Sequence, residues 1–412
     1  MNKLVLSNSI SDQGLADRGL CSDAVYERIE KSLIALEKWL RVNQYAGYDP
    51  FDGLTSHLRL LTFRKCLLER ILEQIVLRSP INLRPLLGIK KRSDIAFARG
   101  HLARGYLRLW NLTGEGLFRD KAVEFLCWLR DHAESGYSGH CWGAPFDHAA
   151  RGGQVPRGTP YLPETSQIGN VFVDAYEILG EQAYLETAVS VCRFIINDLP
   201  REQIDGGFCI SYHPGGQLFI HNANALGAGL LARVGKIIHC QEMMDLARQA
   251  MSYTCNYQLP SGAWYYGQED RYHWIDNFHT AYVLDGLKCY MDSTGDGSFW
   301  KELDRGINFY CTTFFLSDGR PKYYHERLFP IDIQCIAQAI DTLAYLDNHQ
   351  QRSVDLAVKV AIWAIDHMQD KSGYFYYRKL PYKTVKIPMV RWGQAPMLSA
   401  LVNLLIKLKT RC

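Results

Sequence analysis

The segment NALGAGLLAR, which begins at Asn224, has relatives before and after it in the chain. These are NVFVDAYEIL at Asn170, TAYVLDGLKC at Thr280, AQAIDTLAYL at Ala337 and MLSALVNLLI at Met397. Successive segments start 54, 56, 57 and 60 residues apart, a period that indicates stacked structural repeats. Most are rich in Ala, Gly and Leu, and small residues allow neighbouring helices to approach closely. The sequence therefore predicts a series of repeats, each with one helix of this kind.

The sequence between these segments predicts a second, outer helix in each repeat. DLARQAMSYTCNYQ from Asp245 and KELDRGINFYCTTFF from Lys301 carry more charge, as solvent-facing helices do. Most repeats end in a glycine followed by aromatic residues, as in Gly262–Gly267 and Gly373–Tyr377, which is typical of a tight turn. Helical periodicity starts at residue 24 and recurs near 57–78, 92–112, 116–135, 165–180, 183–197, 221–236, 239–256, 276–293, 298–315, 332–347, 352–368 and 392–409.

About six such hairpins cannot bury their apolar faces alone and must stack on one another. The C-terminal repeat stays apolar to Leu408, and the N-terminal helix is amphipathic through Val25, Ile29 and Leu33, so we expect the two ends to pack together. The sequence predicts an all-α fold, a closed (α/α)6 toroid of helical hairpins with short glycine–aromatic turns and a long lid loop. We expect this toroid to form a single domain over 24–412, after an N-terminal tail over 1–23.

Composition limits the classes of function. The chain has 412 residues with 46 Lys and Arg, 43 Asp and Glu and a net charge of +3, which implies neither a nucleic-acid nor an anionic-membrane partner. No run of about 20 apolar residues and no secretory signal is present, so we expect no transmembrane segment and a cytoplasmic location. The 12 cysteines form no Cys-x-x-Cys pair, which favours reduced, buried thiols and no metal site. We expect no cofactor, and the sequence does not define an oligomeric state.

Polar residues gather where each inner helix is expected to begin. Asn and Asp are common helix N-caps, but capping does not explain His221, His279, Arg391 or Trp392. Inner helices of a toroid begin at the same end, so these groups converge on one funnel, where a binding site is expected. With lid and turn residues added, the predicted saccharide-binding residues are His221, Asn222, Asn224, Asn277, Trp142, Arg157, Tyr265, Tyr266, Asp332, Arg391 and Trp392.

Four residues are candidates for acid–base catalysis: Glu164, Asp147, Asp276 and His279. Asp276 and His279 are three residues apart, so they share a helix face and form either an acid with an oriented base or a hydrogen-bonded brace. Asp147 lies within the lid loop expected over 137–165, and Glu164 lies at its end. Each of these two has a simpler interpretation, a solvated loop charge for Asp147 and a helix cap for Glu164. Glycoside cleavage would require two carboxyl groups roughly 5–10 Å apart.

Aromatic residues and one further loop have two interpretations each. Six residues are expected to be either platforms for sugar rings or packing for the turns: Trp142, Trp264, Tyr265, Tyr266, Trp274 and Trp392. The loop Tyr48–Gly53, between the first two helices, either caps the funnel or is a tight turn built from Asp, Pro and Gly.

Several long runs carry a resemblance to known sequences. They are WGAPFD from Trp142, PRGTPYLPETSQIGNVFVDAYE from Pro156, FIHNANALGAGLLARV from Phe219, GAWYYG from Gly262, WIDNFHTAYVLDGL from Trp274 and HERLFPIDIQCIAQAI from His325. Over roughly residues 45–405 the chain resembles uncharacterised six-hairpin-glycosidase-like proteins encoded with bacterial capsule, exopolysaccharide or O-antigen genes. The resemblance implies a toroid and a role in surface-polysaccharide biosynthesis. It supplies no catalytic assignment.

The leading hypothesis is a carbohydrate-active, metal-independent acid–base enzyme whose partner is a saccharide or oligosaccharide in the funnel. Glycoside hydrolysis, uronate elimination and sugar epimerisation all fit, because each needs an acid and a base around a pyranose ring. One alternative is an isomerase that resembles N-acylglucosamine 2-epimerases, which use histidines in the funnel, with His221 and His279 in such parts. Another is a non-catalytic glycan-binding or assembly protein of the polysaccharide pathway.

Overall fold

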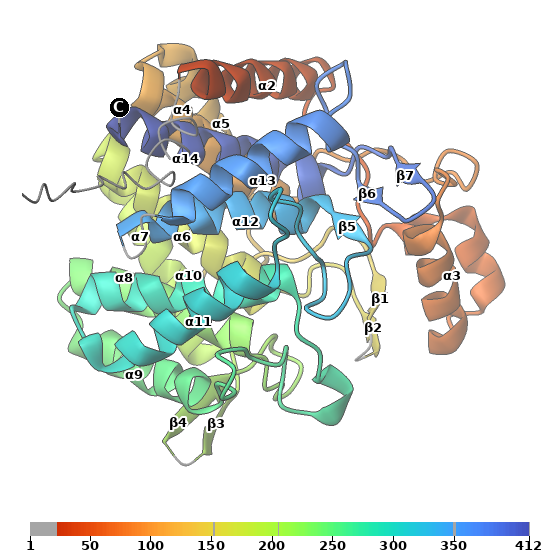
Figure 1. Cartoon of the computed structure of the whole chain (residues 1–412). Helices are drawn as coiled ribbons and strands as arrows, with labels where there is room; N and C mark the ends of the chain where they lie inside the picture. The colour runs from red at the N-terminus through yellow and green to blue at the C-terminus, as the bar shows by residue number, and fades with distance from the viewer. Residues whose placement is uncertain (1–22, 151–152, 205, 349–351, 412) are drawn as a thin grey trace, which may run out of the picture.

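Six helices lie side by side in a closed inner ring in the described part of the chain (Figure 1). This computed structural model describes residues 23–150, 153–204, 206–348 and 352–411. Each inner helix contacts the next along the chain, and the last contacts the first, so the ring is closed. The inner helices are α4 (Ala96–Thr113), α6 (Leu162–Leu179), α8 (His221–Ile237), α10 (Asn277–Thr294), α12 (Ile333–Tyr345) and α14 (Ala395–Arg411).

Each inner helix has an outer partner. Most partners follow their inner helix in the chain, but α14 packs against α2 from the N-terminal end. The outer helices are α2 (Asp23–Val42), α5 (Gly116–Asp131), α7 (Gln182–Asn197), α9 (Gln241–Asn256), α11 (Trp300–Thr313) and α13 (Arg352–Met368). The predicted (α/α)6 toroid is therefore confirmed, and so is the packing of the two chain ends. The tail expected over 1–23 lies outside the described residues except for Asp23, and the single-domain boundary stays a prediction.

Small residues set the spacing of the inner ring between α8 and α10. A Cβ atom added at Gly286 of α10 would lie 2.4 Å from the backbone C and O atoms of Ala225 in α8. One turn further along α8, the carbonyl of Gly229 accepts a hydrogen bond from the Cys289 thiol at 3.4 Å. The two backbones therefore meet with almost no side chain between them, as the Ala- and Gly-rich segments predict.

Two helix boundaries differ from the sequence prediction. The helix expected over 57–78 is broken, because Phe63 and Arg64 adopt left-handed φ angles of 48° and 54°. A 3-10 turn (His57–Thr62) precedes this break and helix α3 (Cys66–Arg78) follows it. The last inner helix is preceded by a π-helical turn, Val390–Gln394, which adds a residue per turn and changes where its side chains point.

Short strands lie in the connections that lead from outer helices to inner ones. β1 (His148–Ala150) pairs antiparallel with β2 (Gly153–Val155) in the expected lid loop. β3 (Arg201–Ile204) pairs with β4 (Gly207–Ile210), and β5 (Ile331–Asp332), β6 (Arg378–Lys379) and β7 (Thr384–Val385) form a three-stranded sheet. Each of these connections leads to the start of an inner helix, at the end of the toroid where the funnel is expected.

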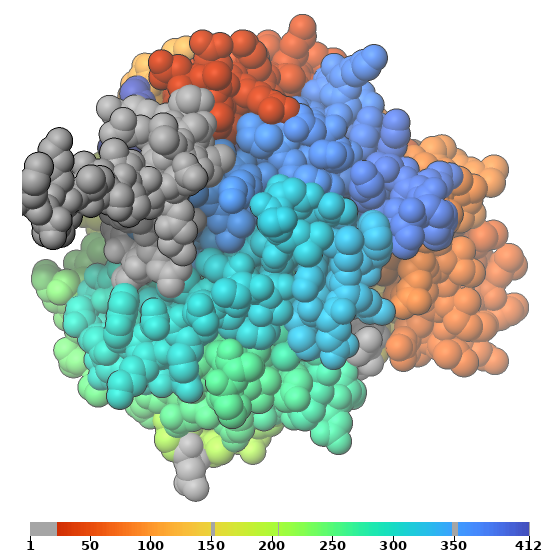
Figure 2. Space-filling view, in the orientation of Figure 1, coloured from red at the N-terminus to blue at the C-terminus, as the bar shows by residue number. Residues whose placement is uncertain are grey.

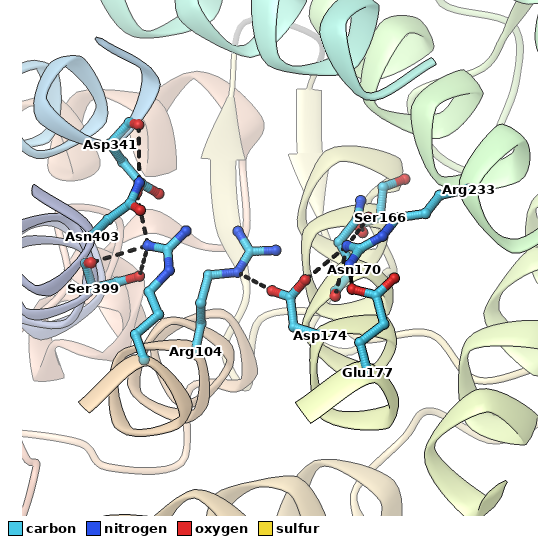
Figure 3. Close-up of polar contacts among 10 residues, drawn as sticks. Arg104, Ser166, Asn170, Asp174, Glu177, Arg233, Asp341, Ser399 and Asn403 are labelled. Atoms are coloured by element: carbon cyan, nitrogen blue, oxygen red, sulfur yellow. Dashed lines mark hydrogen bonds and ion pairs between the residues drawn. The ribbon is translucent and has the colours of Figure 1, made fainter. Parts of the chain in front are cut away.

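Ion pairs cross the interior of the ring away from the funnel (Figure 3). Arg104 of α4 donates to Asp174 of α6 at 2.9 Å, and Arg233 of α8 pairs with the same carboxylate at 2.8 Å. Burial raises the pKa of Asp174, but the two arginines outweigh it and hold that pKa at about 2. Arg108 of α4 donates to Asp341 of α12 at 2.7 Å. These pairs hold four inner helices in register beneath the funnel.

The ten cysteines in the described ranges are free thiols. None of the described helices has the length and apolar character needed to cross a membrane.

Gly286→Ala tests the close approach of α8 and α10. The new methyl group would force two buried backbones apart, and overpacking of this kind costs about 1–3 kcal/mol. We expect urea unfolding to show a loss of stability in that range. The matched control is Gly116→Ala on exposed α5, where an added Cβ meets no atom within 4 Å and helix propensity favours Ala. Equal stability of the two variants would contradict the proposed backbone contact.

Candidate functional site

One guanidinium joins three segments at the bottom of the funnel. Arg391 lies in the π-helical turn before α14 and is 8% exposed. Its Nη1 donates to Oε1 of Glu164 at 2.9 Å, and its Nε and Nη2 donate to the two carboxylate oxygens of Asp49, the latter at 2.9 Å. This fork-shaped contact ties the loop after α2 to the start of α6 and to the last hairpin.

The loop Tyr48–Gly53 has both of its predicted roles. It is a tight turn, since Oδ1 of Asp49 accepts a hydrogen bond from the backbone N–H of Phe51 at 2.8 Å. It also closes one side of the funnel through the contact between Asp49 and Arg391. Burial raises the pKa of Asp49, but the charge of Arg391 outweighs it, so the pKa lies below its ordinary value. Asp49 is therefore an ionised structural carboxylate.

Glu164 differs from Asp49 in that one of its oxygens remains available. Among the described residues, Oε1 accepts from Arg391 and Oε2 has no hydrogen-bond partner. The side chain is 19% exposed, so the funnel reaches it. Burial raises its pKa, Arg391 opposes that rise and the charge of Asp49 adds to it, so the pKa lies above its ordinary value. Glu164 is thus a carboxyl group suited to carry a proton.

Asp276 and His279 form the pair that their spacing predicts. Asp276 caps α10, because its Oδ1 accepts the backbone N–H of His279 at 3.0 Å. Its Oδ2 accepts from Nδ1 of His279 at 2.6 Å and from the indole N–H of Trp274 at 2.8 Å. This arrangement is a brace, and it also fixes the tautomer and orientation of the imidazole, which leaves Nε2 for a ligand. In the described chain Nε2 has no hydrogen-bond partner.

A small pocket lies against this histidine. Asn222, Tyr265, Tyr266 and Thr280 also line it, and Oδ1 of Asn222 is buried without a hydrogen-bond partner. Three of the predicted saccharide-binding residues therefore meet beside the predicted acid–base pair.

Eight aromatic side chains form a closed circle of contacts around the funnel. Neighbouring ring centroids are 3.9–6.0 Å apart at seven of the contacts. A side-chain hydrogen bond between Tyr212 and Tyr266 makes the eighth. In order the rings are Phe51, Trp392, Phe278, His279, Tyr266, Tyr212, Tyr161 and His148. Arg391 lies over two of them, 5.6 Å from Phe51 and 5.4 Å from Trp392.

Asp332 contributes to the site by positioning the side chain of Trp392. Its Oδ1 accepts the indole N–H of Trp392 at 2.9 Å, and its Oδ2 accepts from Nε of Arg378. The carboxylate is fully buried, so its contribution is to hold the Trp392 ring in the circle.

The structure places four predicted binding residues behind the funnel wall. The indole of Trp142 is buried, donates to the Leu129 carbonyl at 2.8 Å and does not face the funnel. His221 is fully buried, and burial lowers its pKa to about 3, so it is a neutral core residue. Asn224 binds backbone and side-chain atoms of α9, and Asn277 accepts from a tyrosine hydroxyl of α11, each as a buried brace.

Asp147 and Arg157 lie on the outer side of the lid loop. Oδ2 of Asp147 pairs with Nη1 of Arg59 at 2.6 Å, and Oδ1 accepts the backbone N–H of Arg157 at 2.8 Å. The Arg157 side chain is exposed. We therefore leave Asp147, Arg157 and the four residues behind the wall out of the proposed site.

Sequence reasoning missed several tyrosines and one histidine. The hydroxyl of Tyr161 contacts Nε2 of His148 at 2.8 Å in the aromatic circle. Tyr282 accepts from Nε2 of Gln334 at 3.0 Å, and its ring centroid is 6.3 Å from that of His279. The signal that would have found Tyr282 is its spacing of three from His279, which places both on one face of α10. Tyr161 is the N-cap residue of α6, outside the helix, and spacing gives no such signal for it.

Comparison with known proteins shows the fold. No family model matches the sequence, and no curated protein matches it. An unsaturated glucuronyl hydrolase specific for heparin is similar in structure, with a TM-score of 0.60, 13% identity and coverage of 92% of this chain and 96% of the other. The cellobiose 2-epimerase from Bacillus thermoamylovorans has a TM-score of 0.60 at 10% identity over 76% of this chain and 88% of the other. A GH76 α-mannanase from Bacteroides thetaiotaomicron has a TM-score of 0.57 at 14% identity over 77% and 87%.

These structures are carbohydrate-active enzymes by their descriptions, and at such identities the likeness shows a six-hairpin-glycosidase-like fold. The expected link with surface-polysaccharide genes finds no support in them and stays a prediction.

Arg391→Met tests the central ion pair. The substitution would leave Asp49 buried without its counter-charge, and breaking a buried pair costs about 3–5 kcal/mol. We expect a loss of that size in denaturant unfolding at neutral pH. The matched control is Arg119→Met, whose side chain is half exposed and whose carboxylate partner is 3.9 Å away. A loss below about 1 kcal/mol for Arg391→Met, as expected of exposed pairs, would contradict the assignment.

Proposed function

We propose that the chain is a metal-independent enzyme that epimerises or isomerises a saccharide in the funnel by acid–base proton transfer. Glu164 serves as the acid and His279 as the base. The proposal rests on the presence of two groups. One is the carboxyl group of Glu164, which has a raised pKa and an available oxygen, and the other is the imidazole of His279, which Asp276 orients.

The number of available carboxyl groups in the funnel favours proton transfer at carbon over glycoside hydrolysis. Most glycosidases use two carboxyl groups, one as acid and one as base or nucleophile. Both oxygens of Asp49, Asp276 and Asp332 accept hydrogen bonds from protein groups. Only Glu164, among the funnel carboxylates described here, keeps an oxygen without such a partner. The second group available for catalysis is therefore an imidazole.

The proposed step follows from these positions. In an open-chain sugar the carbon next to the carbonyl carries an acidic proton, which Nε2 of His279 removes. The negative charge that develops on the carbonyl oxygen is stabilised by the nearby guanidinium of Arg391. The carboxyl of Glu164 then gives its proton to the same carbon from the opposite face in an epimerisation, or to the former carbonyl carbon in an isomerisation. The aromatic circle offers apolar faces to the sugar. Among the described residues, no group of three or more His, Cys, Asp or Glu is arranged to hold a metal ion.

The fold is shared by enzymes of this class as well as by the hydrolases named above, so the choice rests on the side chains of the funnel. Structural neighbours include a sugar epimerase from a ruminal bacterium and a D-mannose isomerase, each at 12% identity with a TM-score of 0.57. Their reactions move protons on a sugar and do not cleave a glycosidic bond. The role in surface-polysaccharide biosynthesis, which the sequence resemblance implies, remains part of the proposal. The cytoplasmic location expected from the sequence also remains part of it.

Solvent-deuterium exchange tests the reaction. The protein is incubated with a panel of reducing sugars in D2O, and label at the carbon next to the carbonyl is followed by NMR. We expect Glu164→Gln and His279→Gln each to lower the rate by about 10²–10⁴, the usual contribution of general acid–base catalysis. The matched control is Glu177→Gln, on the same helix but half exposed and paired with Arg233, with an unchanged rate.

Exchange that survives both substitutions would overturn the assignment of these residues. Release of a reducing end from an oligosaccharide without exchange would instead identify a hydrolase. Saccharide binding without any turnover would identify the non-catalytic alternative.

The pH profile tests the state of Glu164. Because its folded pKa is raised, the acid form is present at low pH and is lost as pH rises through that pKa. We expect kcat/KM to fall on the alkaline side with a midpoint above the ordinary glutamate range, about 4.3. In Glu164→Gln the residual activity should lack this fall. If kcat/KM of Glu164→Gln still falls on the alkaline side as in the parent, another group causes that fall.

A further inference from the structure

Exposed apolar side chains are concentrated in one part of the chain, residues 57–92, which we call the insert. Ten of the sixteen large hydrophobic residues that are exposed in the described structure lie there. Leu60, Phe63 and Leu86 are the most exposed of them, at 84%, 77% and 82%. In Figure 2 the insert is the orange region that projects from the right side of the toroid. A patch of this kind marks an interaction surface.

Helix α3, within the insert, is apolar on two faces. Its inner face buries Leu72 and Val76, together with the carboxylates of Glu69 and Glu73. Its outer face exposes Leu67, Leu68, Ile71 and Ile75, which recur at helical spacing. The inner face explains why the helix packs on the toroid, and the outer face is left without a partner. The loop before α3 continues the outer face with exposed Leu58, Leu60, Leu61 and Phe63.

Basic side chains are exposed on the same insert. The exposed ones are Arg64, Lys65, Arg70, Arg78, Lys90 and Lys91. The acidic residues of the insert, Glu69 and Glu73, are both buried beneath α3. The outer surface of the insert is therefore apolar and positively charged, with no exposed negative charge.

We propose that the insert docks on an anionic lipid surface. Aliphatic and phenyl side chains flanked by Lys and Arg are the pattern by which a helix lies in the interface of a bilayer. The apolar groups enter the boundary between headgroups and acyl chains, and the six cations face anionic headgroups. A second copy of the chain fits this surface less well, because a two-fold contact would bring the same six cations together. Nucleic acid also fits it poorly, because stacking on bases needs aromatic side chains and the exposed set holds one phenyl ring.

The insert is firmly joined to the funnel. Arg59 donates from Nε to Glu69 at 2.8 Å and from Nη1 to Asp147 of the lid loop at 2.6 Å. Arg84 donates to Asp52, at the end of the loop that holds Arg391, at 2.8 Å. Docking of the insert would therefore hold the lid loop and the loop of Asp52 close to the membrane surface. This inference does not depend on the proposed reaction, because it rests on the outer surface of the insert.

Vesicle sedimentation tests the proposal with the full chain. The probes are phosphatidylcholine vesicles with and without about one third phosphatidylglycerol. We expect binding to the anionic vesicles at least tenfold stronger than to the neutral ones, with a marked loss in high salt. The variant Leu60→Ser/Leu61→Ser/Phe63→Ser and the variant Arg64→Gln/Lys65→Gln/Arg70→Gln should each weaken that binding at least tenfold. The control Leu117→Ser/Ile178→Ser removes exposed apolar residues elsewhere and should bind as the parent does.

Three results would overturn the proposal. They are equal binding to both kinds of vesicle, binding that neither triple variant weakens, and a stable dimer in sedimentation velocity that the apolar variant dissociates. The last would show a second copy of the chain as the occupant. Both triple variants replace exposed side chains, and thermal unfolding verifies that each folds.

Discussion

Four buried or partly buried carboxyl groups, three of them paired, lie near two guanidinium groups beside the funnel, and this imbalance of charge governs the site. The carboxyl groups belong to Asp49, Asp52, Glu73 and Glu164, and the guanidinium groups to Arg84 and Arg391. Full ionisation would leave two negative charges without counter-charge in a poorly solvated region, so protons must remain on part of the cluster. Asp49, held by Arg391, keeps a lowered pKa. Burial raises the pKa of Asp52 to about 6 and that of Glu73 to about 9, and it raises that of Glu164 as well.

The toroid was predictable because its signal is local. Ala- and Gly-rich segments recur at a regular period, and the close contact at Gly286 and Ala225 is the structural consequence of that composition. The site was less predictable because side-chain direction on a helix changes by about 100° per residue. His221 and Asn222 are neighbours at the start of α8, yet His221 is buried in the core and Asn222 lines the pocket. A polar cluster at a helix start therefore predicts where the funnel lies, but it does not predict which of its side chains face the funnel.

Ion pairs between residues far apart in the sequence could not be predicted, for a different reason. Arg391 and Asp49 are 342 residues apart and meet because α2 closes the ring against α14. The π-helical turn that aims Arg391 at its partners leaves no clear composition signal. Chain-wide charge does not reveal the insert either, since a net charge of +3 averages over a segment whose exposed charges are all positive. Only burial separates the exposed Arg70 of that insert from the hidden Glu69 and Glu73.

The same charge cluster connects the insert to the proposed acid. Glu73 lies on α3 and Arg84 lies just after it, whereas Glu164 and Arg391 border the funnel, and the loop of Asp49 and Asp52 joins the two sets. Members of such a cluster titrate together, so a proton gained or lost at one changes the pKa of the others. Among them only Glu164 has an oxygen that the funnel reaches. The charges of Asp49 and Asp52 raise the pKa of Glu73, and the charge of Asp49 raises that of Glu164, so this loop acts on both groups.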